Sequence, residues 1–161
     1  PLNGIIASSP FLGLAMKVPS VQKIMANFSS RFFPRLALYP RIKEDELTHD
    51  EAVVESTVRD PFYLRIARAR WFTETLQAQK ETMEQAKSFK FPLLMQQAGD
   101  DRIVDKEVAR EFFEKIGSTD AKRIEYSDYF HEIYNETPER RDRAFSDLKV
   151  WLDEHQSSQT T

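Results

Sequence analysis

The sequence predicts an α/β fold built on a parallel sheet, and residues 91–131 provide the observations behind this prediction. An apolar run at 91–95 has the length of a buried strand, and a second short strand is expected at 122–127. Between them, apolar side chains recur at helical spacing: Val108, Phe112, Phe113 and Ile116. In a parallel α/β sheet, the loops that follow both strands emerge at the same carboxyl edge, where such folds hold their functional sites.

Two residues mark the ends of the helix between these strands. Asp105 stands at its start, where a carboxylate caps a helix and complements the positive end of its dipole. Gly117 follows the last apolar residue, and we expect it in the left-handed conformation that ends many helices. A final helix is expected over 138–155, since Thr137 precedes a proline in the first turn. Its sheet-facing side chains would be Ala144, Leu148, Trp151 and Leu152.

The chain opens with another strand-like run, at residues 4–9, which ends in a turn at Pro10. The predicted sheet therefore has at least three strands, at about 4–9, 91–97 and 122–127. This divides the chain into a core strand in 1–10, an inserted segment at 11–89, the remaining core at 90–156 and a disordered tail at 157–161.

The segment 11–89 is predicted to be entirely helical. One apolar stripe has spacings of three and four, which are typical of a helix: Val21, Ile24, Met25, Phe28 and Phe32. A short helix is expected at Glu51–Arg59, capped by Thr48 or Asp50, and a long helical region at Phe62–Phe89. Stripes of this kind form ordinary packing more often than they line a ligand groove.

An acid and a histidine follow the two predicted strands of the second half. Asp101 lies in the charged turn after the first strand, and His131 lies in the loop after the second. A neutral imidazole acts as a general base only when an acceptor holds its other nitrogen, so these two groups would form a functional pair. From the sequence alone, Asp100 is also a candidate for the acid. His131 could equally be a surface-loop histidine without a catalytic role.

Two motifs carry a resemblance to a known family: GDDRIVD at 99–105 and YSDYFHEIYNE at 126–136. They resemble the C-terminal half of an α/β-hydrolase, in the branch of monoacylglycerol lipases and lysophospholipases (serine aminopeptidase S33-like), where triad residues follow the order Ser, Asp, His. The resemblance implies a partial α/β-hydrolase fold with an inserted helical cap over 11–89. It places the triad acid at Asp101 and the triad histidine at His131, and it implies hydrolysis of lipid esters with one acyl chain.

The nucleophilic serine is expected outside these residues. No G-x-S-x-G motif occurs in the 161 residues, and the four glycines cannot build one. Ser8 and Ser9 are weaker alternatives, because they lack flanking glycines and Pro10 follows at once. The oxyanion-hole amides belong, by the resemblance, to the same missing N-terminal half, so we expect the chain alone to be inactive.

The cap of the resembled family lines an acyl-chain tunnel and contacts the membrane surface. In this chain the apolar stretch after Pro10 is the candidate lining of such a tunnel, in particular Phe11, Leu12, Leu14 and Met16. Burial of each acyl CH₂ contributes about 0.8 kcal/mol, so an apolar channel favours long acyl chains over short esters. A lipid ester is therefore the expected substrate, with peripheral membrane contact through the cap.

Composition excludes several other classes of function. A net charge of −3 argues against a nucleic-acid partner, and the absence of cysteine and of any H-E-x-x-H pattern argues against a metal site. No cofactor is expected, and the lack of cysteine fits a cytoplasmic protein. We expect four other titratable residues to be solvated surface groups: His49, Glu132, Glu136 and His155.

Two alternatives to catalysis remain open at this point. The chain would either bind an apolar ligand on a hydrolase-like scaffold without catalysis, or complete a sheet with another chain. Half of a sheet domain exposes a strand edge and an apolar face, so we expect a homo-oligomer or association with the missing N-terminal half.

Overall fold

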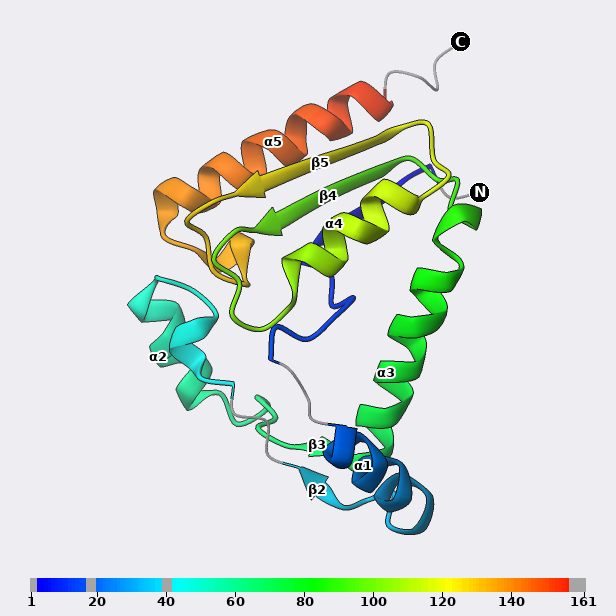
Figure 1. Cartoon of the computed structure of the whole chain (residues 1–161). Coiled ribbons are helices and arrows are strands. Elements are labelled where there is room, and N and C mark those ends of the chain that lie inside the picture. Colours follow the sequence, from blue (N-terminus) through cyan, green and yellow to red (C-terminus); the bar gives the residue numbers. More distant parts are fainter. Residues whose placement is uncertain (1–2, 17–19, 39–41, 157–161) are drawn as a thin grey trace.

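The computed structural model describes residues 3–16, 20–38 and 42–156, and its centre is a three-stranded parallel sheet (Figure 1). The strands are β1 (Ile5–Ser8), β4 (Leu93–Ala98) and β5 (Ala121–Tyr126), in the order β1-β4-β5. The predicted parallel α/β sheet is therefore confirmed, with strand boundaries shifted by one or two residues. The parallel register places the carboxyl ends of all three strands at one edge, with Ser8 beside Gln96 and Ala98 beside Tyr126.

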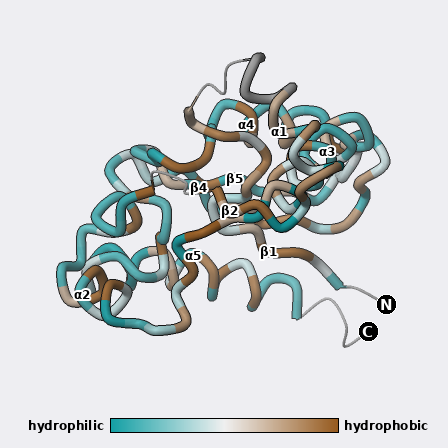
Figure 2. Tube along the Cα trace, turned by 90° about the horizontal axis from the view of Figure 1, so that it is seen from below, coloured by the Kyte–Doolittle hydropathy of each residue, from teal (hydrophilic) through white to brown (hydrophobic). Residues whose placement is uncertain are grey.

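Helices cover both faces of this sheet. On one face, α4 (Lys106–Lys115) and the short helix η2 (Ala86–Ser88) pack on β4, with a core of Ala86, Leu93, Met95, Ala109 and Phe112. On the other, α5 (Pro138–Gln156) and η3 (Ile133–Asn135) cover a core of Ala98, Tyr126, Tyr129, Ile133 and Ala144. The hydrophobic tube segment at β1 in Figure 2 belongs to the same central layer. Removal of these apolar faces from water is what holds the layers together.

A buried polar network crosses the α5 side of the sheet. The Gln96 side chain donates through Nε2 to the Tyr126 hydroxyl at 2.7 Å and to the Ala144 carbonyl at 2.8 Å. Tyr126 in turn donates to Asp147 Oδ2 at 2.9 Å, and the Tyr134 hydroxyl donates to Gln96 Oε1. The network ties β4, β5, η3 and α5 together, because each of its buried polar atoms is costly without a partner.

Tyr126→Phe should lower the free energy of unfolding by about 1–3 kcal/mol, because it leaves a buried Gln96 N–H without its acceptor. Burial raises the pKa of Tyr126 above its ordinary value of 10.0. The folded state thus favours the neutral phenol. The contribution of Tyr126 to the free energy of unfolding is fully present below pH 10 and is lost as the pH rises above 10. Urea unfolding from pH 7 to 11 measures both effects. A variant with unchanged stability at pH 7 would contradict this role for the network.

The segment between β1 and β4 is called the insertion here (residues 11–89). It contains α1 (Ser20–Phe32), η1 (Glu44–Glu46), α2 (Glu51–Arg59) and α3 (Ala69–Glu84). Contrary to the prediction of an entirely helical segment, β2 (Ala37–Leu38) and β3 (Ala67–Arg68) form a short antiparallel pair. The pair fixes the chain between α1 and α3, which pack on each other and share a 2.7 Å hydrogen bond from Thr73 to Ser30.

Helix boundaries in the insertion follow their caps. Asp50 caps α2 as predicted, because its carboxylate accepts from the amides of Ala52 and Val53. The long helix predicted from Phe62 was placed too early: α3 begins at Ala69, and Phe62 is 87% exposed. The Asp60-Pro61 step and the β3 pairing hold residues 60–68 out of helical geometry.

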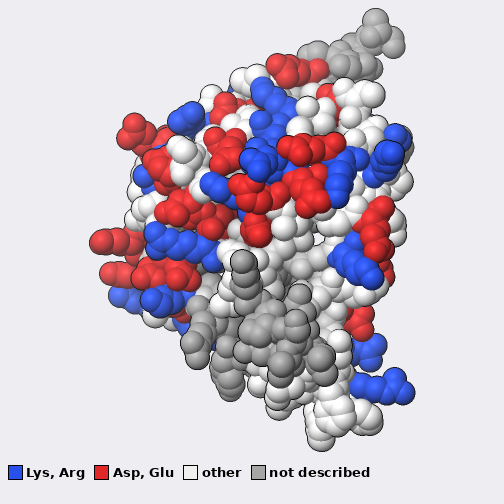
Figure 3. Space-filling view, in the orientation of Figure 1, with Lys and Arg blue, Asp and Glu red and all other residues white. Residues whose placement is uncertain are grey.

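The surface of the insertion is more apolar than ordinary packing predicts. Within the predicted stripe, Met25, Phe28 and Phe32 are exposed, and the side chains of Val21 and Ile24 lie outside the described part. In Figure 3, charged side chains crowd the sheet portion, whereas white side chains predominate at the lower end of the view outside the grey atoms. The three described members of this stripe therefore lie on the surface of the described part of the chain. The predicted disordered tail, 157–161, lies outside the described residues.

Gly117 follows α4 as expected, but for a different reason. No glycine in the described ranges has a positive φ, and α4 ends at Lys115 without a left-handed residue. A Cβ on Gly117 would instead lie 2.3 Å from the carbonyl oxygen of Lys87. Close approach of the backbone, rather than a left-handed turn, explains the glycine there.

Candidate active site

The turn after β4 and the loop after β5 bring Asp101 and His131 together. Oδ2 of Asp101 lies 2.9 Å from Nδ1 of His131, and Oδ1 accepts from the amides of Ile103 and Val104 at 2.9 Å each. The Asp101 side chain is fully buried, whereas 24% of the His131 side chain is exposed. When Nδ1 donates to Oδ2, the neutral ring has no proton on Nε2, and this is the tautomer in which Nε2 can act as a base.

The neighbouring Asp100 has a different environment. Its side chain is 54% exposed and pairs with Arg102 at 3.3 Å. Asp100 and Asp101 follow each other on an irregular backbone, so their side chains point in different directions. Of the two candidate acids, the structure places Asp101 against the imidazole.

The two loops are joined by backbone hydrogen bonds as well as by this pair. The Gly99 amide donates to the Tyr126 carbonyl at 2.7 Å, and the Asp100 amide donates to the Tyr129 carbonyl at 3.1 Å. A Cβ on Gly99 would lie 2.5 Å from Ser127 Cα, so only glycine fits at this crossing. The relative position of the acid and the histidine is therefore set by main-chain contacts.

A cavity of 220 Å³ opens beside His131 and is lined also by Ser8 and residues 132–135. Ser8 ends β1 at the same sheet edge. Ser9 is buried, has a φ of 37°, and accepts through Oγ from the Ala98 amide at 3.2 Å. Ser9 is therefore held by backbone groups of β4.

Of the four predicted lining residues of the insertion, Leu14 lies next to the acid turn. Leu14 forms an isolated antiparallel bridge with Val104, and the Ala15 amide donates to the Ile103 carbonyl at 3.1 Å. Leu12 packs on the core of the sheet, whereas Phe11 and Met16 are exposed. None of the four lines the His131 cavity. The structure thus puts this segment beside Asp101 and leaves two of its apolar side chains on the surface.

The prediction missed a second histidine–carboxylate pair, His49 with Glu136. Oε1 of Glu136 lies 2.7 Å from His49 Nδ1, and the Glu136 side chain is fully buried. Glu136 is therefore not the solvated group that was expected, and His49, although one-third exposed, is held by a buried partner. Burial raises the pKa of Glu136, but hydrogen bonds from the Phe130 amide and from His49 lower it more, to below its ordinary value.

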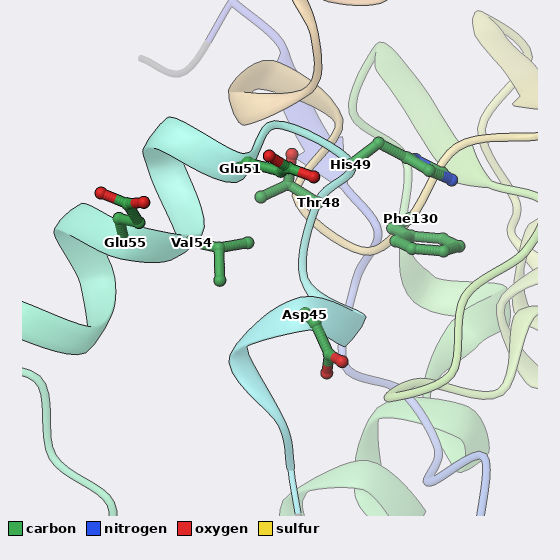
Figure 4. Close-up of a pocket in the computed structure, with 7 residues that line it drawn as sticks. All are labelled: Asp45, Thr48, His49, Glu51, Val54, Glu55 and Phe130. Carbon is green, nitrogen blue, oxygen red and sulfur yellow. The ribbon is translucent and has the colours of Figure 1, made fainter.

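The His49 ring stacks on Phe130, the residue before His131, with ring centres 3.6 Å apart (Figure 4). Both residues line a cavity of 400 Å³ whose other walls are Asp45, Thr48, Glu51, Val54 and Glu55. Glu136 ends the motif YSDYFHEIYNE, five residues after His131. Its presence in that motif was the one sequence signal that it belongs to the same site. Its partner His49 comes from the insertion, and no local pattern connects the two.

His155 is also more engaged than expected. Its ring stacks on Trp151 with centres 3.9 Å apart, and Nε2 lies 3.1 Å from Asp120 Oδ2. Partial burial lowers its pKa, but the Trp151 carbonyl and Asp120 raise it above its ordinary value. Across the described ranges 3–16, 20–38 and 42–156, no three His, Cys, Asp or Glu side chains gather as metal ligands would.

Comparison with known proteins agrees with this geometry. Residues 1–138 match the α/β-hydrolase family described as "Serine aminopeptidase, S33". The chain belongs to this family. Phospholipase YtpA of Bacillus subtilis is 36% identical over 155 residues, a stretch that covers 92% of this chain and 60% of YtpA. The chain thus spans less than two thirds of that relative's length.

Solved structures of two lipases confirm the fold. A monoacylglycerol lipase from Paleococcus ferrophilus superimposes with a TM-score of 0.88 at 25% identity, covering 96% of this chain and 60% of the lipase. A soluble variant of monoglyceride lipase from Saccharomyces cerevisiae gives a TM-score of 0.81 at 23% identity, covering 95% of this chain and 56% of that one. The S33 chain is therefore part of an α/β-hydrolase fold. None of the helices in its described part is both long and apolar enough to cross a bilayer.

Proposed function

We propose that the full-length protein hydrolyses lipid esters with one acyl chain, through a triad of which this chain supplies two members. The observation that carries the proposal is the 2.9 Å contact between buried Asp101 and partly exposed His131. His131 Nε2 would take the proton of a serine as its oxygen attacks the ester carbonyl, and then deliver that proton to the leaving alcohol. A water molecule then gives a proton to Nε2 and attacks the acyl-serine ester, which releases the fatty acid and returns the proton to the serine oxygen. Asp101 holds the imidazole throughout.

The serine belongs, in this proposal, to the remainder of the protein. Among the described residues β1 is an edge strand, and its outer side carries no partner. A further parallel strand there would end at the same edge as β4 and β5, where His131 lies. For this reason we favour association with the missing N-terminal half over a homo-oligomer.

A fluorophosphonate probe tests the nucleophile directly, because it forms a covalent bond with an activated serine. We expect the full-length protein to be labelled on one serine outside these 161 residues, and His131→Ala to lose the labelling. Peptide mass spectrometry identifies the site. Labelling of Ser8, which shares the His131 cavity, would place the nucleophile inside this chain and refute this version. A protein that is not labelled at all would favour a non-catalytic binding function.

The insertion supports a lipid substrate. We propose that it acts as a cap whose apolar residues, with Phe11, Leu12, Leu14 and Met16 at its start, border the acyl chain and contact the membrane surface from the cytoplasmic side. Support comes from the exposed apolar side chains of α1 and the following turn: Met25, Phe28, Phe32 and Phe33.

The acyl preference gives a measurable consequence. Because burial of one CH₂ contributes about 0.8 kcal/mol, kcat/KM should rise up to about fourfold per methylene that enters the channel. Assays with monoacylglycerols and lysophosphatidylcholines of increasing acyl length, beside a short nitrophenyl ester, measure this slope. A short ester cleaved as efficiently as the long substrates would contradict an apolar acyl channel.

A further inference from the structure

Three consecutive residues of the insertion bind the loop that carries His131. The Leu47 carbonyl accepts from the Glu132 amide at 2.8 Å, and the Thr48 hydroxyl donates to the Asn135 carbonyl at 2.7 Å. His49 approaches Glu136 through its amide at 3.3 Å and through Nδ1 at 2.7 Å. We call this set of contacts, between residues 47–49 and 130–136, the clamp.

Glu136 is the centre of the clamp. Besides the two His49 groups, its carboxylate accepts from the Phe130 amide at 2.8 Å and from the Thr137 amide at 3.3 Å, and the Arg140 guanidinium lies 3.6 Å away. The same guanidinium lies 2.5 Å from His49 Nδ1. The ionised carboxylate can only accept, so Nδ1 of His49 donates in the tautomer that bonds Glu136, and in that tautomer it does not accept from Arg140. A charged carboxylate is stable in a buried site only when hydrogen bonds and an opposite charge compensate for the lost water.

The clamp fixes the backbone on both sides of His131. The residue before it, Phe130, is held by Glu136, and the residue after it, Glu132, is held by Leu47. The Phe130 ring also lies between the His49 ring and the Arg102 guanidinium, whose carbon is 4.5 Å from the ring centre. Arg102 follows Asp101, so the stack extends from the insertion across the loop to the acid turn.

We propose that Glu136, with His49 as its partner, is a positioning residue that couples the insertion to His131. This inference rests on the proposed function, because it concerns how His131 is aimed at the ester. Asp101 fixes the ring nitrogen, but the ring can reach the serine only if the loop backbone is also fixed. A displacement of the imidazole by about 1 Å from its position beside the serine lowers the rate on the order of 10²-fold.

Glu136→Gln in the full-length protein should lower kcat about 10- to 100-fold, with KM within about twofold, since the substrate contacts are unchanged. An amide keeps the shape but directs an NH₂ group at donors and removes the charge. His49→Ala, a change at a one-third exposed side chain, removes the ring contact and should lower kcat by a smaller factor. The His49→Ala variant also tests the inference if the Glu136→Gln variant fails to fold. Glu139→Gln, at an exposed carboxylate three residues further on, is the matched control.

A double mutant separates positioning from general damage to the fold. If Glu136 acts through His131, Glu136→Gln adds no further loss of residual activity per folded protein when His131 is already alanine. Losses that multiply in the double mutant, or a single Glu136→Gln variant with unchanged kcat, would overturn the inference. Retained activity in His131→Ala alone would instead refute the proposed function, so the two failures are distinguishable.

Discussion

Replacement of His131 by alanine, or of Asp101 by asparagine, is expected to lower kcat of the full-length protein at least about 10³-fold. Alanine removes the imidazole that, in the proposed mechanism, takes the serine proton. Asparagine turns an acceptor at 2.9 Å from Nδ1 into a group that can donate there. The imidazole would then carry its proton on Nε2, where a base must be unprotonated.

Steady-state kinetics on the preferred ester measures both variants. Two controls are matched to them: Asp100→Asn changes the exposed neighbouring carboxylate, and His155→Gln changes a histidine that stacks on Trp151 in α5. Both controls should keep kcat within a few-fold of the unmodified protein. Near-normal turnover in either Asp101→Asn or His131→Ala would remove these residues from the reaction.

Gly99→Ala is expected to lower the free energy of unfolding by about 3 kcal/mol, at the upper end of the usual cost of overpacking. The new methyl carbon would lie 2.5 Å from Ser127 Cα and 2.7 Å from the Tyr126 carbonyl oxygen. These are main-chain atoms, so no rotation of a side chain relieves the overlap. The two loops must separate, and the separation also moves Asp101 away from His131.

Chemical denaturation and kinetics on the same preparation test this effect. Gly13→Ala is the comparison, because its methyl group would meet a side chain, Val108 Cγ2 at 2.9 Å, which has more room to adjust. We expect a smaller loss of stability there. Equal effects at the two glycines would show that the crossing at Gly99 is not the constraint we describe.

Much of the sheet portion was predictable because its signals are local. β1 and β4 begin as short apolar runs, and α4 and α2 carry their capping carboxylates, Asp105 and Asp50, one residue before the helix. The family resemblance rested on two contiguous motifs, and the match over residues 1–138 confirms the family. Parallel strand ends meet at one edge, so nearness of Asp101 and His131 followed from topology.

The insertion was predicted less well, because its pattern is decided by partners distant in the sequence. The β2–β3 pair consists of two residues in each strand, too short to leave an alternation of apolar and polar residues. Phe62 continues the apolar spacing of α3 but lies outside the helix and remains exposed. Apolar spacing alone does not tell a helix face from a surface segment.

The sequence by itself determined the layered α/β scaffold and the family, since each depends on residues close together in the chain, and the order of the strands predicted that Asp101 and His131 meet. Only the tertiary structure decided that Glu136 is buried and that His49 is its partner, 87 positions away. A carboxylate is usually solvated, and nothing local in the sequence shows that four N–H groups converge on this one. Folding supplies those donors, and their hydrogen bonds offset the cost of removing the charge from water.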